Sequence, residues 1–292
     1  MRQGVEMGNA KILVAGATGN IGSALVAQLM QTPSSTDVVA ASLGGQSVAG
    51  APGRALNLLD SNSAQAAMQG VERLFLLTPA HPEMEAMTAH AVRAAQAAGV
   101  QHIVCVSGAG ADPKSEIAIA RLQGRCDQIV IDSGIAHTLL QPKNFMQNFT
   151  TFLRDMVRNG MAYSSQGNGR VPFIDARDIA AVAARVLRER QAHAGKVYTL
   201  TGPQALTHAE ALAVIAEHIG RPIQLVAISE EQAVDGMRQA GMPEPLVQAM
   251  SSLNRIIAAG WVAEVTDDVS RLLGRPAAAW ADFVAEHRGL WS

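Results

Sequence analysis

Three glycines at positions 16, 19 and 22 form the part of the sequence with the clearest chemical consequence. They lie in the segment GATGNIG, which follows an apolar run expected to form a strand and opens a helical pattern. In that setting Gly16 permits a tight turn, Gly19 lets a pyrophosphate approach the backbone, and Gly22 allows close packing of helix on strand. The unpaired N–H groups of the helix amino terminus also favour phosphate. The segment predicts a dinucleotide site with further contacts at Thr18, Asn20 and Ile21; the alternative is a tight turn that has lost its ligand.

The elements that must position this turn alternate between short apolar, β-branched runs and longer helical patterns. Strands are predicted at 11–15, 37–41, 54–58, 73–77, 102–106 and 137–140, and helices at 21–30, 64–68, 84–98 and 117–132. This alternation is typical of βαβ units on a parallel sheet, and strands that are apolar throughout are covered on both faces. The prediction is an α/β fold with a doubly wound parallel sheet.

The regular alternation weakens after residue 144, which indicates a second domain. Further elements are predicted as a helix to about 159, a strand-like 171–174, a helix from 175 or 176 to about 190, a strand at 196–200, a capped helix at 207–219, a strand at 224–228 and mostly helix from 229 to 292. The expected division is a dinucleotide-binding domain at 10–145, to which strands from 146–200 can return, and a smaller, mostly helical cap or substrate domain at 146–292.

Composition and charge exclude several classes of protein. The formal net charge is −2 and the pI is near 6.4, so a basic surface for nucleic acid is not expected. No stretch reaches the roughly 18 to 20 apolar residues of a membrane-spanning helix, and the first ten residues are polar. Two cysteines form no disulfide framework, and no metal-binding spacing is found. We expect a cytoplasmic protein without a metal, a membrane segment or a nucleic-acid partner; the oligomeric state stays open.

A family resemblance rests on several segments together. Residues 12–22 (ILVAGATGNIG) resemble the start of the NmrA-like, atypical short-chain dehydrogenases/reductases. Further similar segments are 74–79 (LFLLTP), 98–104 (AGVQHIV), 133–135 (SGI), 144–149 (NFMQNF), 172–180 (PFIDARDIA) and 198–203 (YTLTGP). The resemblance covers about residues 10–284 and implies a Rossmann-like domain that binds NADP(H) or NAD(H). Members include NAD(P)H:quinone oxidoreductases and triphenylmethane-dye reductases, and others are redox-sensing regulators.

The end of the second strand bears on which cofactor is used. An acidic residue there favours NAD and an arginine favours NADP. This sequence has neither, although Ser42 and Gln46 can hydrogen-bond a ribose or phosphate and Arg54 can reach back. NADP(H) is favoured over NAD(H) because the resemblance implies it.

Other cofactor contacts follow from topology, because ligands of open α/β sheets bind beyond the carboxyl ends of the strands. The loops after the later strands contribute Leu77, Thr78, Pro79, Ser107, Asn144 and Phe145. Asp60 is either a contact near the adenine or a helix cap.

The acid–base pair of ordinary short-chain dehydrogenases, Tyr-x-x-x-Lys, is absent. The chain has two tyrosines, Tyr163 and Tyr198, and neither precedes a lysine at that spacing. The corresponding positions are Ile119 and Gln123, which cannot transfer a proton in this way. Standard alcohol oxidation or sugar epimerisation is therefore not expected.

Reduction of a quinone demands less, because its developing oxyanion can be stabilised by hydrogen bonds or protonated from water. Lys143, in the loop after the sixth strand, and His81, after the fourth, are candidate catalytic donors; the alternatives are an exposed surface lysine and a solvated loop histidine. Phe145, Met146 and Phe149 suit a flat aromatic substrate or core packing.

Carboxylates and tryptophans in the second half have simpler interpretations. Asp175 and Asp178 are expected to cap and complement a helix start. The tryptophans at 261, 280 and 291 are expected to pack within the second domain; the alternative is that they form a wall of the substrate site.

The leading hypothesis is an NAD(P)H-dependent oxidoreductase that reduces a small quinone-like or conjugated aromatic acceptor by direct hydride transfer. One alternative is a non-catalytic NAD(P)-sensing regulator that acts through protein partners. A lower alternative is an isomerase or lyase of a biosynthetic pathway.

Overall fold

The structure is a computed structural model that describes residues 12–31 and 37–292. The chain divides into two compact units, each built from several segments. Unit 1 comprises the described residues up to 107 with 124–140 and 180–198, and unit 2 comprises 108–123, 141–179 and 199–292. The strand prediction at 11–15 begins at a residue outside the described part.

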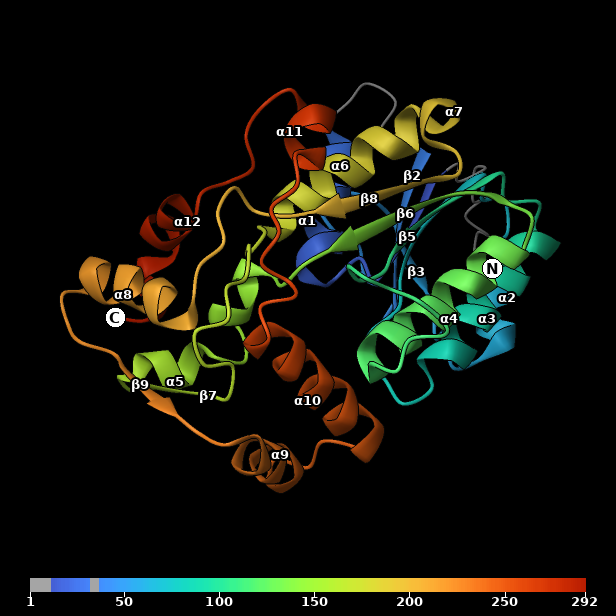
Figure 1. Cartoon of the computed structure of the whole chain (residues 1–292). Coiled ribbons are helices and arrows are strands. Elements are labelled where there is room, and N and C mark those ends of the chain that lie inside the picture. Colours follow the sequence, from blue (N-terminus) through green and yellow to red (C-terminus); the bar gives the residue numbers. More distant parts are fainter. Residues whose placement is uncertain (1–11, 32–36) are drawn as a thin grey trace. The chain divides into compact units, whose positions relative to one another are not determined.

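A seven-stranded parallel sheet forms the centre of unit 1, in the order β3-β2-β1-β4-β5-β6-β8 (Figure 1). Its strands are β1 (Ile12–Ala15), β2 (Val38–Ser42), β3 (Gly53–Ala55), β4 (Arg73–Leu77), β5 (His102–Val106), β6 (Ala136–Pro142) and β8 (Lys196–Leu200). Every residue of β1, β2 and β5 is buried, as expected for strands covered on both faces. The predicted α/β fold with a doubly wound sheet is confirmed.

The strand order reverses at β1, which lies between β2 and β4. In register, Ile12 pairs with Val38 on one side and with Arg73 on the other. The loops after β1 and β4 therefore leave the sheet at its switch point, where open α/β sheets bind ligands.

Unit 1 also contains helices, and several of them share one apolar cluster with the sheet. The elements are α1 (Asn20–Met30), α2 (Ser61–Ala67), α3 (Met84–Ala97), the part of α4 (Ala118–Asp132) from residue 124, the part of α6 (Ala176–Arg188) from residue 180, and α7 (Arg190–His193). Leu13, Leu74 and Ile103 of the sheet share one cluster with Met68 and Ala91. Full burial of a large apolar side chain stabilises the fold by about 1.5–3 kcal/mol.

The third strand is shorter than predicted and begins one residue earlier. The N–H of Leu56 still donates to the carbonyl of Ser42 (2.9 Å), but the side chain of Asn57 then accepts the N–H of Leu59 (3.0 Å) and turns the chain. Asp60 caps α2 by accepting the N–H of Asn62 (2.9 Å). The helix-cap alternative for Asp60 is confirmed.

Unit 2 has a second core and a small parallel sheet. Its elements are η2 (Met146–Phe149), α5 (Arg154–Arg158), β7 (Met161–Ser164), α8 (His208–Ile219), β9 (Gln224–Ala227), α9 (Glu230–Gln239), α10 (Glu244–Ala258), α11 (Asp268–Leu273), α12 (Trp280–His287) and η3 (Arg288–Leu290). Strands β7 and β9 pair with each other. The capping box predicted at Thr207 is present at the start of α8.

Two tryptophans lie inside the core of unit 2, and their indole N–H groups have partners. Trp280 Nε1 donates to the carbonyl of Ala211 (3.0 Å) and Trp291 Nε1 to that of Phe149 (2.8 Å). The ring centroids of Phe149 and Trp280 lie 4.8 Å apart. Packing was therefore correctly predicted for Trp280 and Trp291, and core packing is the outcome for Phe149.

Two other predictions in this region are wrong. The single helix expected up to about residue 159 is divided into η2 and α5. The strand-like segment 171–174 makes isolated bridges only, between Val171 and Leu206 and between Phe145 and Ile174.

The two carboxylates near the start of α6 differ from each other. Asp175 accepts the N–H of Arg177 (2.8 Å) and pairs with its guanidinium (2.7 Å), so its predicted capping is confirmed. Burial raises the pKa of Asp175, but hydrogen bonds from Arg177 and Gln147 outweigh it and hold the pKa below its usual value. Asp178 instead accepts the N–H of Ala278 (2.7 Å) and pairs with Arg275 (2.7 Å). Asp178 lies in the first turn of α6, as expected for a carboxylate that complements the helix dipole, but it does not cap the helix, because its partners come from a distant segment.

No helix within 12–31 or 37–292 combines the length and apolar character needed to cross a membrane.

Candidate functional site

The glycine-rich turn connects β1 to α1 with an open helix terminus. Gly16 has a φ of +75°, in the left-handed region that favours glycine, and the N–H of Gly19 donates to its carbonyl (3.0 Å). Gly19 is the N-cap residue of α1, and no side chain caps the helix there. Thr18, Gly19 and Asn20 are exposed. The turn thus presents backbone N–H groups at a helix amino terminus, the arrangement that binds phosphate.

Gly19 and Gly22 differ in the space that a side chain would have. A Cβ on Gly22 would lie 2.1 Å from the carbonyl oxygen of Gly16, so only glycine lets α1 pack this closely. A Cβ on Gly19 would meet nothing nearer than that same oxygen at 3.4 Å. Gly19 is therefore not needed for packing, and its missing side chain leaves room for a ligand. The turn fits the pyrophosphate of a dinucleotide.

Ser42 is the last residue of β2, and the turn that follows it, residues 42–46, contains no charged side chain. Its buried hydroxyl donates to Oε1 of Gln46 (2.9 Å). The guanidinium of Arg54 donates to the carbonyls of Ala67 and Gln69, at the end of α2. Arg54 is therefore committed to a helix terminus, and the polar groups available at the end of β2 are neutral.

The loops after β4 and β5 complete the group in unit 1. A Cβ on Gly16 would lie 3.5 Å from the carbonyl oxygen of Leu77, so the end of β4 adjoins the glycine turn. Thr78 is buried, and its hydroxyl lies 3.1 Å from that of Thr88, which donates to Met84. The Thr78 hydroxyl therefore donates to Thr88, and Thr78 stays a prediction as a cofactor contact. Pro79 is exposed.

Ser107 and His81 present different hydrogen-bonding groups. The backbone N–H of Ser107 donates to the carbonyl of Leu140 (2.8 Å), whereas its Oγ is buried with no partner among the described residues. His81 accepts the N–H of Glu83 at Nδ1 (3.0 Å), so the neutral ring carries its proton at Nε2. His81 can donate a hydrogen bond from that nitrogen.

Lys143, Asn144 and Phe145 follow β6 and belong to unit 2. The carbonyl of Asn144 accepts the N–H of Ile174 (2.9 Å), and Phe145 is half-buried. Met146 is almost fully buried in the core of unit 2, so it is not available to line a substrate site. Asn144 and Phe145 stay predictions as cofactor contacts.

Lys143 is not the exposed surface lysine that the alternative assumed. Its ammonium donates to the carbonyls of Val262 (2.8 Å) and Glu264 (2.7 Å). Burial lowers the pKa of Lys143, and the charge of Glu264 opposes this effect. Two of its three N–H groups are used, which leaves one for another acceptor.

Two further candidates come from the tertiary structure. Trp261 is 71% exposed, so the prediction that it packs within the domain is wrong. It precedes Val262, whose carbonyl binds Lys143, and it therefore lies beside the loop after β6.

Gln123 lies against the segment that follows β5, since a Cβ on Gly108 would be 3.4 Å from Cγ of Gln123. Oε1 of Gln123 is buried without a partner within the described chain. In the sequence, Gln123 is marked only by its position, which corresponds to the lysine of the absent Tyr-x-x-x-Lys pair.

Unit 1 therefore brings together the glycine turn, Ser42, Leu77, Thr78, Pro79 and Ser107 at the carboxyl ends of neighbouring strands. These residues offer backbone N–H groups, neutral hydroxyls and no acid–base pair. Unit 2 separately holds Lys143, Asn144 and Phe145. No group of three or more metal-ligating side chains is found within 12–31 and 37–292.

Comparisons with known proteins agree with this arrangement. The model of the NmrA-like family matches residues 8–271. The NAD(P)H azoreductase of Xenophilus azovorans is 39% identical over 279 residues, covering 94% of this chain and 97% of that protein. The structure of the Escherichia coli NADPH-dependent quinone oxidoreductase complexed with NADPH has a TM-score of 0.82 at 27% identity, covering 94% and 99%. The Citrobacter sp. triphenylmethane reductase complexed with NADP(H) has a TM-score of 0.80 at 25% identity, covering 95% and 99%. The resemblance found in the sequence is confirmed.

Proposed function

Because the chain belongs to the NmrA-like family, we propose that it is an NAD(P)H-dependent oxidoreductase that reduces a quinone-like or other conjugated aromatic acceptor by direct hydride transfer. The observation that carries the proposal is the turn at Gly16, Gly19 and Gly22, where an open helix terminus meets a position with room for phosphate. The similar azoreductase and quinone oxidoreductase support the reaction class.

The cofactor is proposed to be NADP(H) in preference to NAD(H). The solved structures of two similar proteins hold NADPH and NADP(H). The end of β2 carries Ser42 and Gln46, so no carboxylate repels a 2′-phosphate there. The bound nicotinamide would supply the hydride. The glycine turn would bind the pyrophosphate, and Leu77, Pro79 and Ser107 would provide further contacts to the cofactor.

The acceptor is proposed to be a small, flat aromatic molecule. Such acceptors take hydride without a strong general acid, provided that hydrogen bonds stabilise the negative charge that develops. Lys143 retains one N–H for this task, and its lowered pKa favours release of a proton. His81 is the second candidate donor through Nε2. Trp261 offers an exposed ring on which an aromatic acceptor can stack.

Dinucleotide binding is proposed to rest mainly on residues 10–145 and substrate binding mainly on 146–292, with Lys143 and His81 of the first range as the donors to the acceptor. Both cysteines are free thiols, which suits the reducing cytoplasm as the working compartment.

The proposal is tested by calorimetric titration with NADPH, NADH, NADP⁺ and NAD⁺, followed by turnover with quinones, an azo dye and a triphenylmethane dye. We expect NADPH to bind more tightly than NADH and to be oxidised only when an acceptor is present. Deuterium at the transferable position of NADPH should appear in the product or slow turnover, as direct transfer requires. Tight binding without turnover across the panel would favour the sensing alternative, and failure of all four dinucleotides to bind would overturn both.

A further inference from the structure

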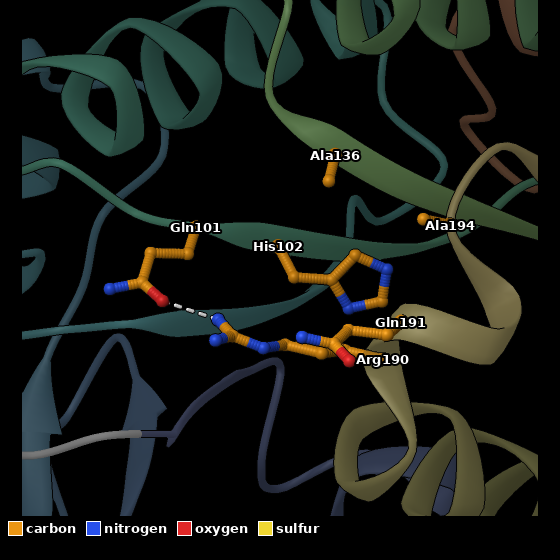
Figure 2. A pocket seen from close by; sticks show the side chains of 6 residues that line it. All are labelled: Gln101, His102, Ala136, Arg190, Gln191 and Ala194. Carbon is orange, nitrogen blue, oxygen red and sulfur yellow. Dashed lines mark hydrogen bonds between the residues drawn. The ribbon is translucent and has the colours of Figure 1, made fainter.

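A cavity lies in unit 1 at the amino ends of the neighbouring strands β5 and β6 (Figure 2). Its volume is about 280 Å³, and it is lined by Gln101, His102, Ala136, Arg190, Gln191 and Ala194. His102 is the first residue of β5 and Ala136 the first of β6, and the two pair in register. The glycine turn follows the carboxyl end of β1. Because the strands are parallel, the cavity at the amino ends of β5 and β6 lies at the opposite end of the strands from the glycine turn. It is not part of the proposed hydride-transfer site.

The hydrogen bonds of His102 determine which of its nitrogens carries the proton. The hydroxyl of Thr138 donates its single proton to the carbonyl of His193 (2.8 Å). Its oxygen, 3.1 Å from His102 Nε2, must therefore accept a hydrogen bond from that nitrogen. In the neutral ring Nδ1 is then a bare acceptor, and it is buried with no partner among the described residues. Figure 2 shows the imidazole lying over the side chains of Arg190 and Gln191.

An unpaired donor accompanies this unpaired acceptor. Arg73, the first residue of β4, pairs in register with His102 and therefore points to the same face of the sheet. One guanidinium nitrogen of Arg73 donates to the carbonyl of Leu187 (3.0 Å), but its Nε is buried without a partner in the described chain. A buried polar group without a partner destabilises the folded state, because it has lost its hydrogen bonds to water. Arg73 does not line the cavity, so the unpaired group that a ligand can meet there is Nδ1 of His102, which accepts a hydrogen bond from a donor such as a hydroxyl.

The charges around the cavity favour an anion. Burial, followed by the charge of Arg190 and smaller effects of His137, His193 and Arg73, lowers the pKa of His102 to about 4. The ring is thus neutral near pH 7 and adds no charge, while Arg190 and Arg73 leave the region positive. One guanidinium nitrogen of Arg190 donates to Gln101, as the dashed line in Figure 2 marks. The rest of its planar donor set can bind a carboxylate.

We propose that this cavity binds a small organic anion that carries a hydroxyl group beside its charge, of the 2-hydroxy carboxylate class. The hydroxyl donates to Nδ1 of His102, and the carboxylate lies against Arg190 and Gln191. The volume is several times the roughly 30 Å³ that one water molecule occupies in the liquid, so the cavity has room for such a ligand. Binding would fasten α7 to the amino ends of β5 and β6.

The test uses lactate, glycerate and malate as probes, with propionate and sulfate as anions that lack the hydroxyl. Binding is measured by calorimetry on the full chain, with and without NADPH. We expect at least one hydroxy acid to bind at least about tenfold more tightly than propionate, because propionate has no hydroxyl to donate to Nδ1 of His102. A factor of ten in affinity corresponds to about 1.4 kcal/mol. NADPH affinity should be unchanged, which keeps this test separate from that of the proposed reductase activity.

Two variants and one spectroscopic signal locate the binding. Arg190→Gln should weaken binding of the hydroxy acid at least about tenfold, because it removes the guanidinium. Arg93→Gln makes the same change of charge at an exposed position of α3 outside the cavity and should leave binding unchanged. In ¹⁵N spectra of the histidine rings, the Nδ1 signal of His102 should move with lactate and not with propionate. Equal binding of propionate, no effect of Arg190→Gln, or no binding by any hydroxy acid would overturn the proposal.

Discussion

Replacing Gly19 by alanine should separate cofactor binding from folding. Gly19 has a φ of −81° and a ψ of 173°, which alanine also adopts, and the new Cβ would lie no closer than 3.4 Å to the carbonyl oxygen of Gly16. The methyl group would nevertheless stand at the open helix terminus of α1, where the pyrophosphate is proposed to contact the backbone. The protein should fold and lose affinity for NADPH.

The expected magnitudes follow from this geometry. Alanine is a poorer N-cap than glycine, at a cost of about 0.5–1 kcal/mol, and this is offset by about 0.4–1 kcal/mol from the lower entropy of the unfolded chain. The net change in stability should be small, with a Tm shift below about 2 °C. Loss of one or two hydrogen bonds to a charged group, at about 1.5–3 kcal/mol each, should raise the Kd of NADPH by about tenfold to ten-thousandfold.

Gly22→Ala provides the contrasting variant, because its Cβ would lie 2.1 Å from a backbone oxygen. Overlap of this kind requires a backbone shift, so Gly22→Ala should lower the Tm by many degrees even without cofactor. Differential scanning calorimetry of the free protein and titration with NADPH measure both effects. A folded Gly19→Ala protein that binds NADPH with unchanged affinity would refute the assignment of this turn to the pyrophosphate.

Three further outcomes are expected. Lys143→Met should lower kcat more than it changes the Kd of NADPH. Lys143→Arg is the matched control, because it keeps the positive charge. A kcat of Lys143→Met equal to that of the unchanged protein would contradict a catalytic role. Trp261→Ala should raise KM for aromatic acceptors several-fold with unchanged NADPH binding, whereas an unchanged KM would place this exposed ring away from the acceptor. Burial lowers the pKa values of His102 and His208 to about 4, so from about pH 6.5 down to 4 the unfolded chain binds protons that the folded chain does not. The unfolding free energy should therefore fall on acidification across that window, by up to about 3 kcal/mol for each histidine, and urea midpoints that do not fall from pH 7 to pH 5 would contradict this.

Local features were predicted well from the sequence because their causes act within a few residues. The turn from Gly16 to Gly22 depends on backbone sterics and on a helix that begins beside it. The caps at Asp60 and Thr207 join a side chain to an N–H two or three residues away. The buried strands were visible because a strand covered on both faces has to be apolar along its length.

Tertiary structure alone decided where the longer-range polar partners lie. Lys143 finds its carbonyl partners at Val262 and Glu264, 119 and 121 residues away along the chain, so the sequence left both a catalytic donor and an exposed surface lysine open. His102 owes its tautomer to Thr138, whose own partner is the carbonyl of His193. Trp261 and Trp280 are the same residue type, but only Trp280 meets a buried carbonyl that can accept its indole N–H. A backbone carbonyl can serve any donor that reaches it, and which donor does so depends on the folded path of the chain.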